Sequence, residues 1–244
     1  MENFSIINNI KLVIWDLDET FWQGTLSEEG IQVINENVEI IKTLTDRGIM
    51  NSVASKNDFQ IAKDKLISIG IWQYFCFPKI SWEPKRNLIK EIIRYFQLRP
   101  ENVLFIDDNK HNLKEACFYN NNLNVKEPSF ISDILSHPSF KGKNDFEHSR
   151  LKQYKILEEK NKHKQIYSSN ADFLASSNIK IFFDKNTLQN FYRVEELIER
   201  TNQLNYTKNR ASSSDLLNDL KNPDFDSCLT RVSDNYGDSD IIEN

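Results

Sequence analysis

The sequence has little cysteine, no excess of positive charge and no long hydrophobic run. Its 244 residues include three widely separated cysteines, an odd number without metal-ligand spacing, so we expect no disulfide and a reducing, cytoplasmic location. Acidic residues outnumber basic ones by 36 to 31, and the formal charge of −5 argues against nucleic acid as a partner. The apolar run before Asp16 is too short for a signal peptide or a membrane span.

What the sequence does contain, from residue 11 to about 125, is an alternation of short apolar runs with helical periods. This alternation is typical of a doubly wound α/β fold with a parallel sheet. We expect strands at 11–15, 49–55, 74–77, 103–107 and 123–125. We expect helices at 38–48, 58–70, 85–96 and 112–118.

A linker and a long charged helix follow this region. Residues 127–145 carry prolines, serines and Gly142, which predicts a linker or surface loop. Residues 146–167 predict one helix, whose basic character suits a nucleic-acid or membrane face. We favour a solvated helix instead, because acidic residues are interleaved and aromatic stacking groups are few. Its expected packed side consists of Leu151, Tyr154 and Leu157.

A second unit is expected from about residue 178. Strands are predicted at 178–183 and 226–234, and helices at 190–205 and 212–220, the latter beginning on a serine cap. The predicted division is therefore 1–126, 127–177 and 178–244. We expect the last of these to be an α+β unit that the chain does not complete.

Two aspartates follow the first predicted strand directly. Asp16 and Asp18 lie just past 11–15, at the strand end where open α/β sheets bind ligands. Two aspartates separated by one residue suit a nucleophile paired with an acid or base. An acidic strand end is also common in turns and helix caps, so this pair alone leaves both interpretations open.

Three further polar signals follow the other predicted strands. Ser55 ends the second strand, Lys85 opens the helix after the third, and Asp107 and Asp108 close the fourth. Each of these positions lies about one β-α unit after the previous one, so all of them are expected at the same end of the parallel strands. Taken singly, each residue also has a purely structural explanation, either as a helix cap or as a solvated charge in the first turn of a helix. Taken together, they predict a Mg²⁺-assisted phosphoryl-transfer site.

This set resembles the four motifs of the haloacid dehalogenase (HAD) superfamily. The motifs are DLDET (16–20), the serine of VASKND (53–58), the lysine of WEPK (82–85) and the acids of FIDDN (105–109). The resemblance implies Asp16 as the nucleophile that forms an aspartyl-phosphate, and Asp18 as general acid and then base. It implies Mg²⁺ held by the Asp16 carboxylate, the Asp18 carbonyl and Asp107, with Asp108 in contact through water.

The same resemblance assigns the transferring phosphoryl group to a second set of residues. These are Thr20, Ser55, Lys56, Asn57 and Lys85. Lys85 would also offset the repulsion between the Asp16 carboxylate and an incoming dianion. Between Thr20 and the helix predicted at 38 there is room for a hairpin flap with Trp22 but not for a cap domain. An open crevice is expected, which favours a bulky or protein-tethered substrate.

Longer strings are similar to the FkbH-like (HAD-IIIC) branch of the superfamily. They are 14–31, 55–58, 81–88, 104–116 and 193–210, with a weaker likeness at 234–242. In that family the HAD domain precedes a region resembling a GNAT-type acyltransferase, and members load a glyceryl group from a bisphosphoglycerate onto an acyl carrier protein. The resemblance implies an acyl-site remnant at Arg200, Asn202, Gln203, Asn205 and Arg210. A helix with a polar exit loop explains these five residues equally well.

The sequence departs from the FkbH-like pattern at two positions. Ala54 stands where members often have cysteine, which excludes a cysteinyl thioester there, and Asp240 stands where glycine is expected. Three functions are therefore weighed. The first is a Mg²⁺-dependent HAD phosphatase or phosphotransferase acting on a phosphorylated small molecule or a carrier-linked substrate. The second is a glyceryl transferase whose partner is an acyl carrier protein, and the third is a non-catalytic scaffold.

Overall fold

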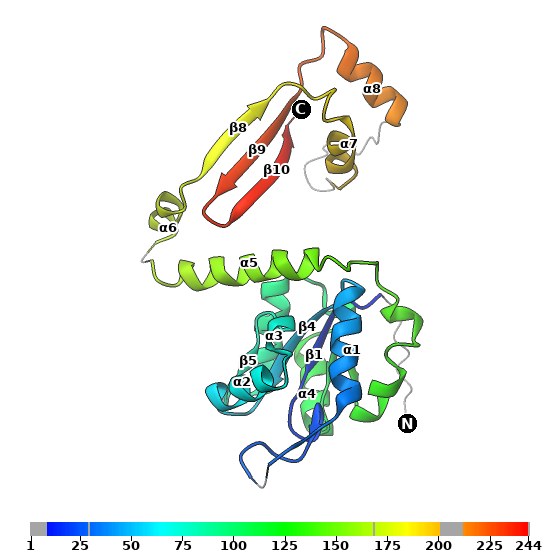
Figure 1. Ribbon diagram of the computed structural model, residues 1–244, viewed down its shortest axis with the longest axis vertical. Helices are drawn as coiled ribbons and strands as arrows, with labels where there is room; N and C mark the ends of the chain where they lie inside the picture. Colours follow the sequence, from blue (N-terminus) through cyan, green and yellow to red (C-terminus); the bar gives the residue numbers. More distant parts are fainter. Residues whose placement is uncertain (1–8, 29, 168, 201–211, 244) are drawn as a thin grey trace. The chain divides into compact units, whose positions relative to one another are not determined.

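A computed structural model describes residues 9–28, 30–167, 169–200 and 212–243. The chain divides into two compact units, residues 1–158 and 159–244. The first unit is built on a five-stranded sheet of order β5-β4-β1-β6-β7, in which every neighbouring pair is parallel (Figure 1). This confirms the predicted α/β class. Within the described residues, no helix has the length and apolar character needed to cross a bilayer.

The sheet and helices of the first unit agree closely with the sequence pattern. Its strands are β1 (Leu12–Trp15), β4 (Met50–Ser55), β5 (Lys79–Ile80), β6 (Val103–Ile106) and β7 (Asn124–Lys126). Its helices are α1 (Asn35–Asp46), α2 (Phe59–Ser68), α3 (Lys85–Phe96) and α4 (Lys110–Tyr119). The residue range of α3 is the predicted one, and α2 begins after the Asp58 cap, as expected.

The two faces of the sheet bury separate hydrophobic clusters, because successive strand residues point to opposite faces. In β1, Val13 and Trp15 join a cluster to which α1, α2 and several loop segments contribute. Leu12 and Ile14 join the opposite cluster, which α3 and α4 complete. α5 (Ser149–Lys164) contributes Leu151 to this second cluster, with Tyr154 and Leu157 packed against it. The predicted packed side of that helix is thereby confirmed.

Two sequence predictions for the first unit are corrected. The run 74–77 is not a strand: residues Trp72–Tyr74 form a 3₁₀ turn, Phe75 makes a single bridge to Asn51, and the strand lies at β5. Phe75 and Cys76 are fully buried, so the apolar run reflects burial rather than strand pairing. Residues 127–145 are not merely a linker.

That segment contains two 3₁₀ helices, Pro128–Asp133 and Pro138–Phe140. They place Ile131, Ile134 and Phe140 in the cluster on the α1 side of the sheet. The first compact unit therefore extends past the predicted boundary at residue 126.

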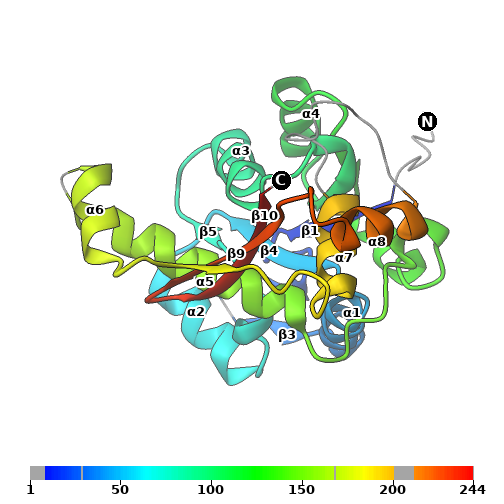
Figure 2. The same cartoon turned by 90° about the horizontal axis from the view of Figure 1, so that it is seen from above.

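The second unit contains a three-stranded antiparallel sheet of order β10-β9-β8. Its strands are β8 (Lys180–Asp184), β9 (Cys228–Asp234) and β10 (Gly237–Glu243), and its helices are α6 (Asn170–Ser176), α7 (Phe191–Arg200) and α8 (Ser213–Lys221). Figure 1 shows the three strands side by side, and Figure 2 shows β9 and β10 again from a second direction. β8, β9 and the serine-capped α8 agree with prediction, whereas β10 was not predicted as a strand.

Candidate active site

The carboxyl ends of three parallel strands bring the candidate residues together. Asp16 follows β1, Ser55 ends β4 and Asp107 follows β6, while Lys85 opens α3 beside them. The strand ends are tied by backbone hydrogen bonds: the Asp16 amide donates to the Ile106 carbonyl at 3.0 Å. The predicted convergence on one edge of the sheet is therefore seen in the structure.

Lys85 joins the two strand-end aspartates. Its Nζ lies 2.7 Å from Asp16 Oδ2 and 2.5 Å from Asp107 Oδ2. Lys85 is 4% exposed, Asp16 5% and Asp107 0%, so this ion triad is almost completely removed from solvent. Charges in such an environment interact more strongly than on a wet surface, but each carries a large desolvation cost.

Burial raises the pKa of the Asp16 carboxyl to about 6. The Lys85 ammonium opposes this shift, and the negative charge of Asp107 adds to it. Burial also raises the pKa of Asp108, again with Asp107 acting in the same direction. The site therefore holds more negative charge than its lysine neutralises.

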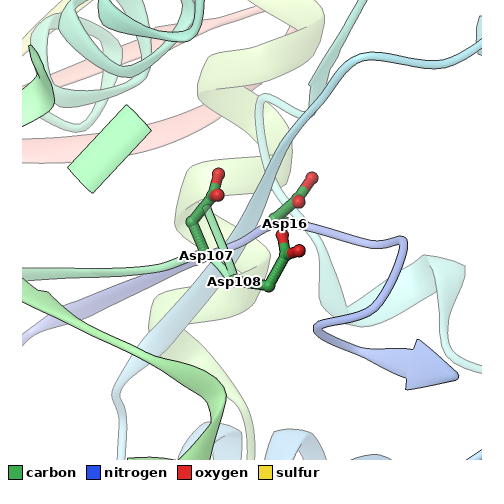
Figure 3. Close-up of side chains that lie close together, drawn as sticks. All are labelled: Asp16, Asp107 and Asp108. Atoms are coloured by element: carbon green, nitrogen blue, oxygen red, sulfur yellow. The ribbon is translucent and has the colours of Figure 1, made fainter. Parts of the chain in front are cut away.

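Three carboxylates form a cluster suited to a cation. One carboxylate oxygen from each of Asp16, Asp107 and Asp108 lies within 4.8 Å of the other two, and Figure 3 shows the three side chains close together. Carboxylate oxygens are the ligands that Mg²⁺ prefers. Asp108 belongs to this cluster, and its expected contact with the ion through water stays a prediction. The Asp18 carboxylate lies outside the cluster, and the group of Asp18 that is predicted to bind the ion is its backbone carbonyl instead.

The Asp18 carboxylate instead accepts three hydrogen bonds. Its Oδ1 accepts from Trp22 Nε1 at 2.8 Å and from the Leu26 amide at 3.1 Å. Its Oδ2 accepts from Asn57 Nδ2 at 3.0 Å. The side chain is thus oriented from two directions, by the segment after β1 and by the loop after β4.

The predicted phosphate-binding residues divide into two groups. Ser55, Lys56 and Lys85 line a cavity of about 280 Å³ together with the aspartates. The full lining consists of Asp16, Asp18, Glu19, Thr25, Ser55, Lys56, Lys85, Asp108, Asn109 and Asn112. Thr20 and Asn57 are not part of that lining, and both are buried.

Thr20 and Asn57 hold other site residues. The Thr20 hydroxyl accepts from the Asp108 amide at 3.0 Å, which fixes the turn after β6. Asn57 Nδ2 donates to Ser55 Oγ at 3.2 Å as well as to Asp18. Their hydrogen bonds in the structure go to protein groups, and the phosphate contacts that the resemblance implies for both stay a prediction.

Sequence reasoning missed Asn112. Its Nδ2 lies 3.1 Å and 3.3 Å from the two carboxylate oxygens of Asp107, and the Asn109 amide donates to Asp107 Oδ1 at 2.8 Å. The signal was present in the first turn of α4, where an asparagine five residues after Asp107 returns toward the strand end.

The flap over the site is small, as predicted. β2 (Trp22–Gln23) and β3 (Gln32–Val33) pair antiparallel, and the chain continues from β3 almost directly into α1. Gly24 has φ +87°, and a Cβ there would lie 2.6 Å from the Gly30 carbonyl oxygen, so this turn requires glycine. The acyl-site candidates Asn202, Gln203, Asn205 and Arg210 lie outside the described residues, as does the side chain of Arg200.

No protein-family model matches the chain, and a search of curated proteins finds no match. Among solved structures, it is similar to the phosphatase-domain-containing N-terminal part of a Bacteroides fragilis protein complexed with Mg, at 25% identity and a TM-score of 0.48. That similarity covers 56% of this chain and spans 41% of the other.

Two further solved structures are similar over part of the chain. One is the cobalt-bound deoxy-D-mannose-octulosonate 8-phosphate phosphatase from Haemophilus influenzae, at 19% identity and a TM-score of 0.41, covering 70% of this chain and 99% of that one. The other is a HAD-superfamily hydrolase from Ehrlichia chaffeensis, at 10% identity and a TM-score of 0.42, covering 53% and 99%. The solved structures similar to this chain thus include a phosphatase domain, a sugar-phosphate phosphatase and a hydrolase described as a HAD-superfamily member.

Proposed function

We propose that this chain is a Mg²⁺-dependent phosphohydrolase of HAD type, in which Asp16 is the nucleophile. The observation that carries the proposal is the buried triad of Asp16, Lys85 and Asp107, with Asp108 beside it, at the carboxyl ends of the parallel strands. A purely structural role does not account for so many buried charges in one cavity, because each is costly to desolvate.

The residues present fit a magnesium ion. Asp16, Asp107 and Asp108 supply oxygen ligands, and Lys85 pairs with only two of the three carboxylates. These three residues would hold the ion, and the predicted contribution of the Asp18 carbonyl belongs to the same proposal. When bound, Mg²⁺ supplies positive charge that stabilises the phosphoryl oxygens and keeps Asp16 ionised.

The first half of the reaction transfers the phosphoryl group to the protein. A carboxylate oxygen of Asp16 bonds to phosphorus, and the bond from phosphorus to the leaving oxygen breaks. Asp18 donates its proton to that oxygen, which departs as an alcohol. Lys85 offsets the repulsion between Asp16 and the phosphate, and the Ser55 hydroxyl and Lys56, which line the cavity, bind the phosphate oxygens.

The second half of the reaction returns the protein to its starting state. A water oxygen bonds to phosphorus as the bond from phosphorus to Asp16 breaks. Asp18, now a carboxylate, accepts the proton that the water releases. Inorganic phosphate leaves, Asp18 is again protonated and Asp16 is again a carboxylate, so the sum of the two halves is hydrolysis of a phosphate ester.

The test is phosphatase turnover with an aryl phosphate in Mg²⁺. Asp16→Asn is expected to lower kcat by at least about a thousandfold, since it removes the nucleophile. Asp64→Asn, which changes an exposed aspartate on α2, is the matched control and should retain wild-type turnover. Full turnover by Asp16→Asn would reject the nucleophile. Absence of both Mg²⁺ binding and turnover in the wild-type chain would favour the scaffold alternative.

A narrower second proposal concerns the substrate. The flap is only a short hairpin, and the cavity beneath it is small, which supports a phosphorylated group presented on a larger molecule, including a carrier-linked one. Glyceryl loading of an acyl carrier protein, in the manner of the FkbH-like branch, is the specific form of this proposal. Incubation with a bisphosphoglycerate and a carrier protein should add a glyceryl mass to the carrier, and no adduct with several carriers would reject it. We also propose a cytoplasmic location for this activity.

A further inference from the structure

Asp18 is held more tightly than a solvent-facing acid or base requires. The carboxylate has about four lone-pair positions. Two donors, the Trp22 indole and the Leu26 amide, converge on Oδ1, and one donor, Asn57 Nδ2, reaches Oδ2. Oδ1 is therefore saturated, whereas Oδ2 keeps one lone pair for a proton.

The Trp22 indole, one of the two donors from the flap, is held rigidly. Trp22 is fully buried, and its ring packs edge-on against Phe21 at 6.0 Å between centroids. Phe21 packs in the same way against Trp15 at 5.7 Å. The indole N–H of Trp22 is thus fixed by the hydrophobic core of the first unit, and a buried indole N–H normally requires a partner. Its partner here is a residue of the active site.

The donor from the other side connects two site residues. Asn57 is 4% exposed, and its Nδ2 donates to both Asp18 Oδ2 and Ser55 Oγ. Ser55 lines the cavity, so Asn57 links a group that faces the phosphate to the group that handles the proton. Asn57 does not itself line the cavity.

We propose that Trp22 and Asn57 are positioning residues that fix the rotation of the Asp18 carboxylate, so that Oδ2 is the atom that gives and takes the proton. This proposal rests on the proposed function, because it assigns the orientation of its acid and base. Neither residue is expected to touch the substrate. Their effect is therefore expected in the proton-transfer steps rather than in substrate binding.

The choice of leaving group separates this role from a structural one. An alkyl phosphate needs a proton from Asp18 before its alkoxide departs, whereas 4-nitrophenolate departs without one. Trp22→Phe keeps the buried ring but removes the N–H. It is expected to lower kcat for an alkyl phosphate by about 10- to 100-fold, with little change in KM.

With 4-nitrophenyl phosphate the same variant should behave differently. Formation of the aspartyl-phosphate stays fast, but its hydrolysis slows because Asp18 no longer faces the water correctly. The phosphorylated protein then accumulates, so we expect a rapid burst of nitrophenolate close to one equivalent, followed by slow turnover. A variant that merely contained less folded protein would lose activity equally with both substrates and show no burst.

The chain offers a matched control. Trp15 is a second fully buried tryptophan in the same hydrophobic cluster, and its Nε1 donates to Asn51 Oδ1 at 3.0 Å instead of to a site residue. Trp15→Phe removes an equivalent buried hydrogen bond, so it should lower the free energy of unfolding by a similar amount. The ratio of its kcat values for the alkyl phosphate and for 4-nitrophenyl phosphate should stay at the wild-type value, and no nitrophenolate burst should appear. If Trp22→Phe does not fold, Asn57→Ala, which removes the donor to Oδ2, provides the decisive kinetics.

Each outcome has a distinct meaning. A burst and a leaving-group effect in Trp22→Phe but not in Trp15→Phe support the positioning role. Equal behaviour of the two variants with both substrates overturns it while leaving the proposed function intact. Absence of turnover by the wild-type chain with either phosphate ester in Mg²⁺ rejects the proposed function itself.

Discussion

The strands of the two units differ in how far they are covered. In the first unit every residue of β1, β4 and β6 is buried, because helices pack on both faces of the sheet. In the second unit four of the five residues of β8 are exposed, although three of them, Ile181, Phe182 and Phe183, are apolar. Apolar composition favours a strand in both places, whereas burial depends on what packs against it.

This difference shows why the charged site lies in the first unit. A lysine and two aspartates can be held almost without solvent only where the surrounding strands and helices leave no room for water. The ion pair between Lys185 and Asp226 in the second unit has side chains 72% and 83% exposed. Removing the lysine is therefore expected to cost far more stability in the buried triad than in the exposed Lys185–Asp226 pair.

The largest expected effect comes from breaking the buried triad. Lys85→Met leaves two buried carboxylates without their counter-charge, which should lower the free energy of unfolding by about 3–5 kcal/mol in the absence of metal. It should also abolish detectable phosphatase turnover. All four tryptophans lie in the first unit, so tryptophan fluorescence in urea with EDTA measures this change directly.

The comparison variant is Lys185→Met in the second unit. Because the pair is exposed, its loss should change stability by less than about 1 kcal/mol, measured by hydrogen exchange of β8 and β9. Added Mg²⁺ should recover part of the stability of Lys85→Met, since a cation replaces the lost charge, and should not affect Lys185→Met. Equal costs for the two variants would contradict the contrast drawn between the units.

A smaller effect on the free energy of unfolding is expected from a change in pH. Without metal, the folded protein holds the pKa of Asp16 at about 6, above the ordinary value of 3.8, so the native state binds more protons than the unfolded state between these values. Stability should therefore fall as pH rises from about 4 to 6, by up to about 3 kcal/mol from this group. Mg²⁺ favours the ionised carboxylate and should flatten the slope.

The measurement is urea unfolding across this pH range in EDTA and in Mg²⁺. Asp16→Asn does not titrate, so the difference between wild type and variant isolates Asp16 from Asp108 and the remaining acids. A wild-type stability that rises through the same window relative to Asp16→Asn would show that Lys85, rather than burial, dominates the environment of this carboxyl.

Sequence patterns predicted those parts of the fold and site that depend on local order. The placement of Asp16, Lys85 and Asp107 follows from strand ends in a parallel sheet, and α3 follows from its apolar spacing. The core role of 127–145 was missed, since Ile131, Ile134 and Phe140 are irregularly spaced among prolines and serines. β10 was missed because GDSDIIE has few apolar residues.

The partners of polar side chains could not be predicted in this way. Thr20 and Asn57 belong to motifs that suggest phosphate contact, but their hydrogen bonds go to the Asp108 amide, Asp18 and Ser55. A motif specifies which residues approach the site. Which of them face the cavity depends on tertiary geometry, and so does the saturation of one oxygen of Asp18.

The smallest expected effects test whether the two units also differ locally. Asp58 caps α2 in the first unit by accepting from the Ile61 amide at 2.9 Å, and Ser212 caps α8 in the second by accepting from the Asp215 amide at 3.2 Å. A cap acts within one helical turn, so Asp58→Ala and Ser212→Ala should each cost about 1 kcal/mol, measured by hydrogen exchange in the capped helix. Equal losses of stability in the two variants would show that the units differ in the packing between their helices and strands, and not within single helices. A negligible cost at Ser212 alone would instead show that the second unit is weaker even at the level of the single helix.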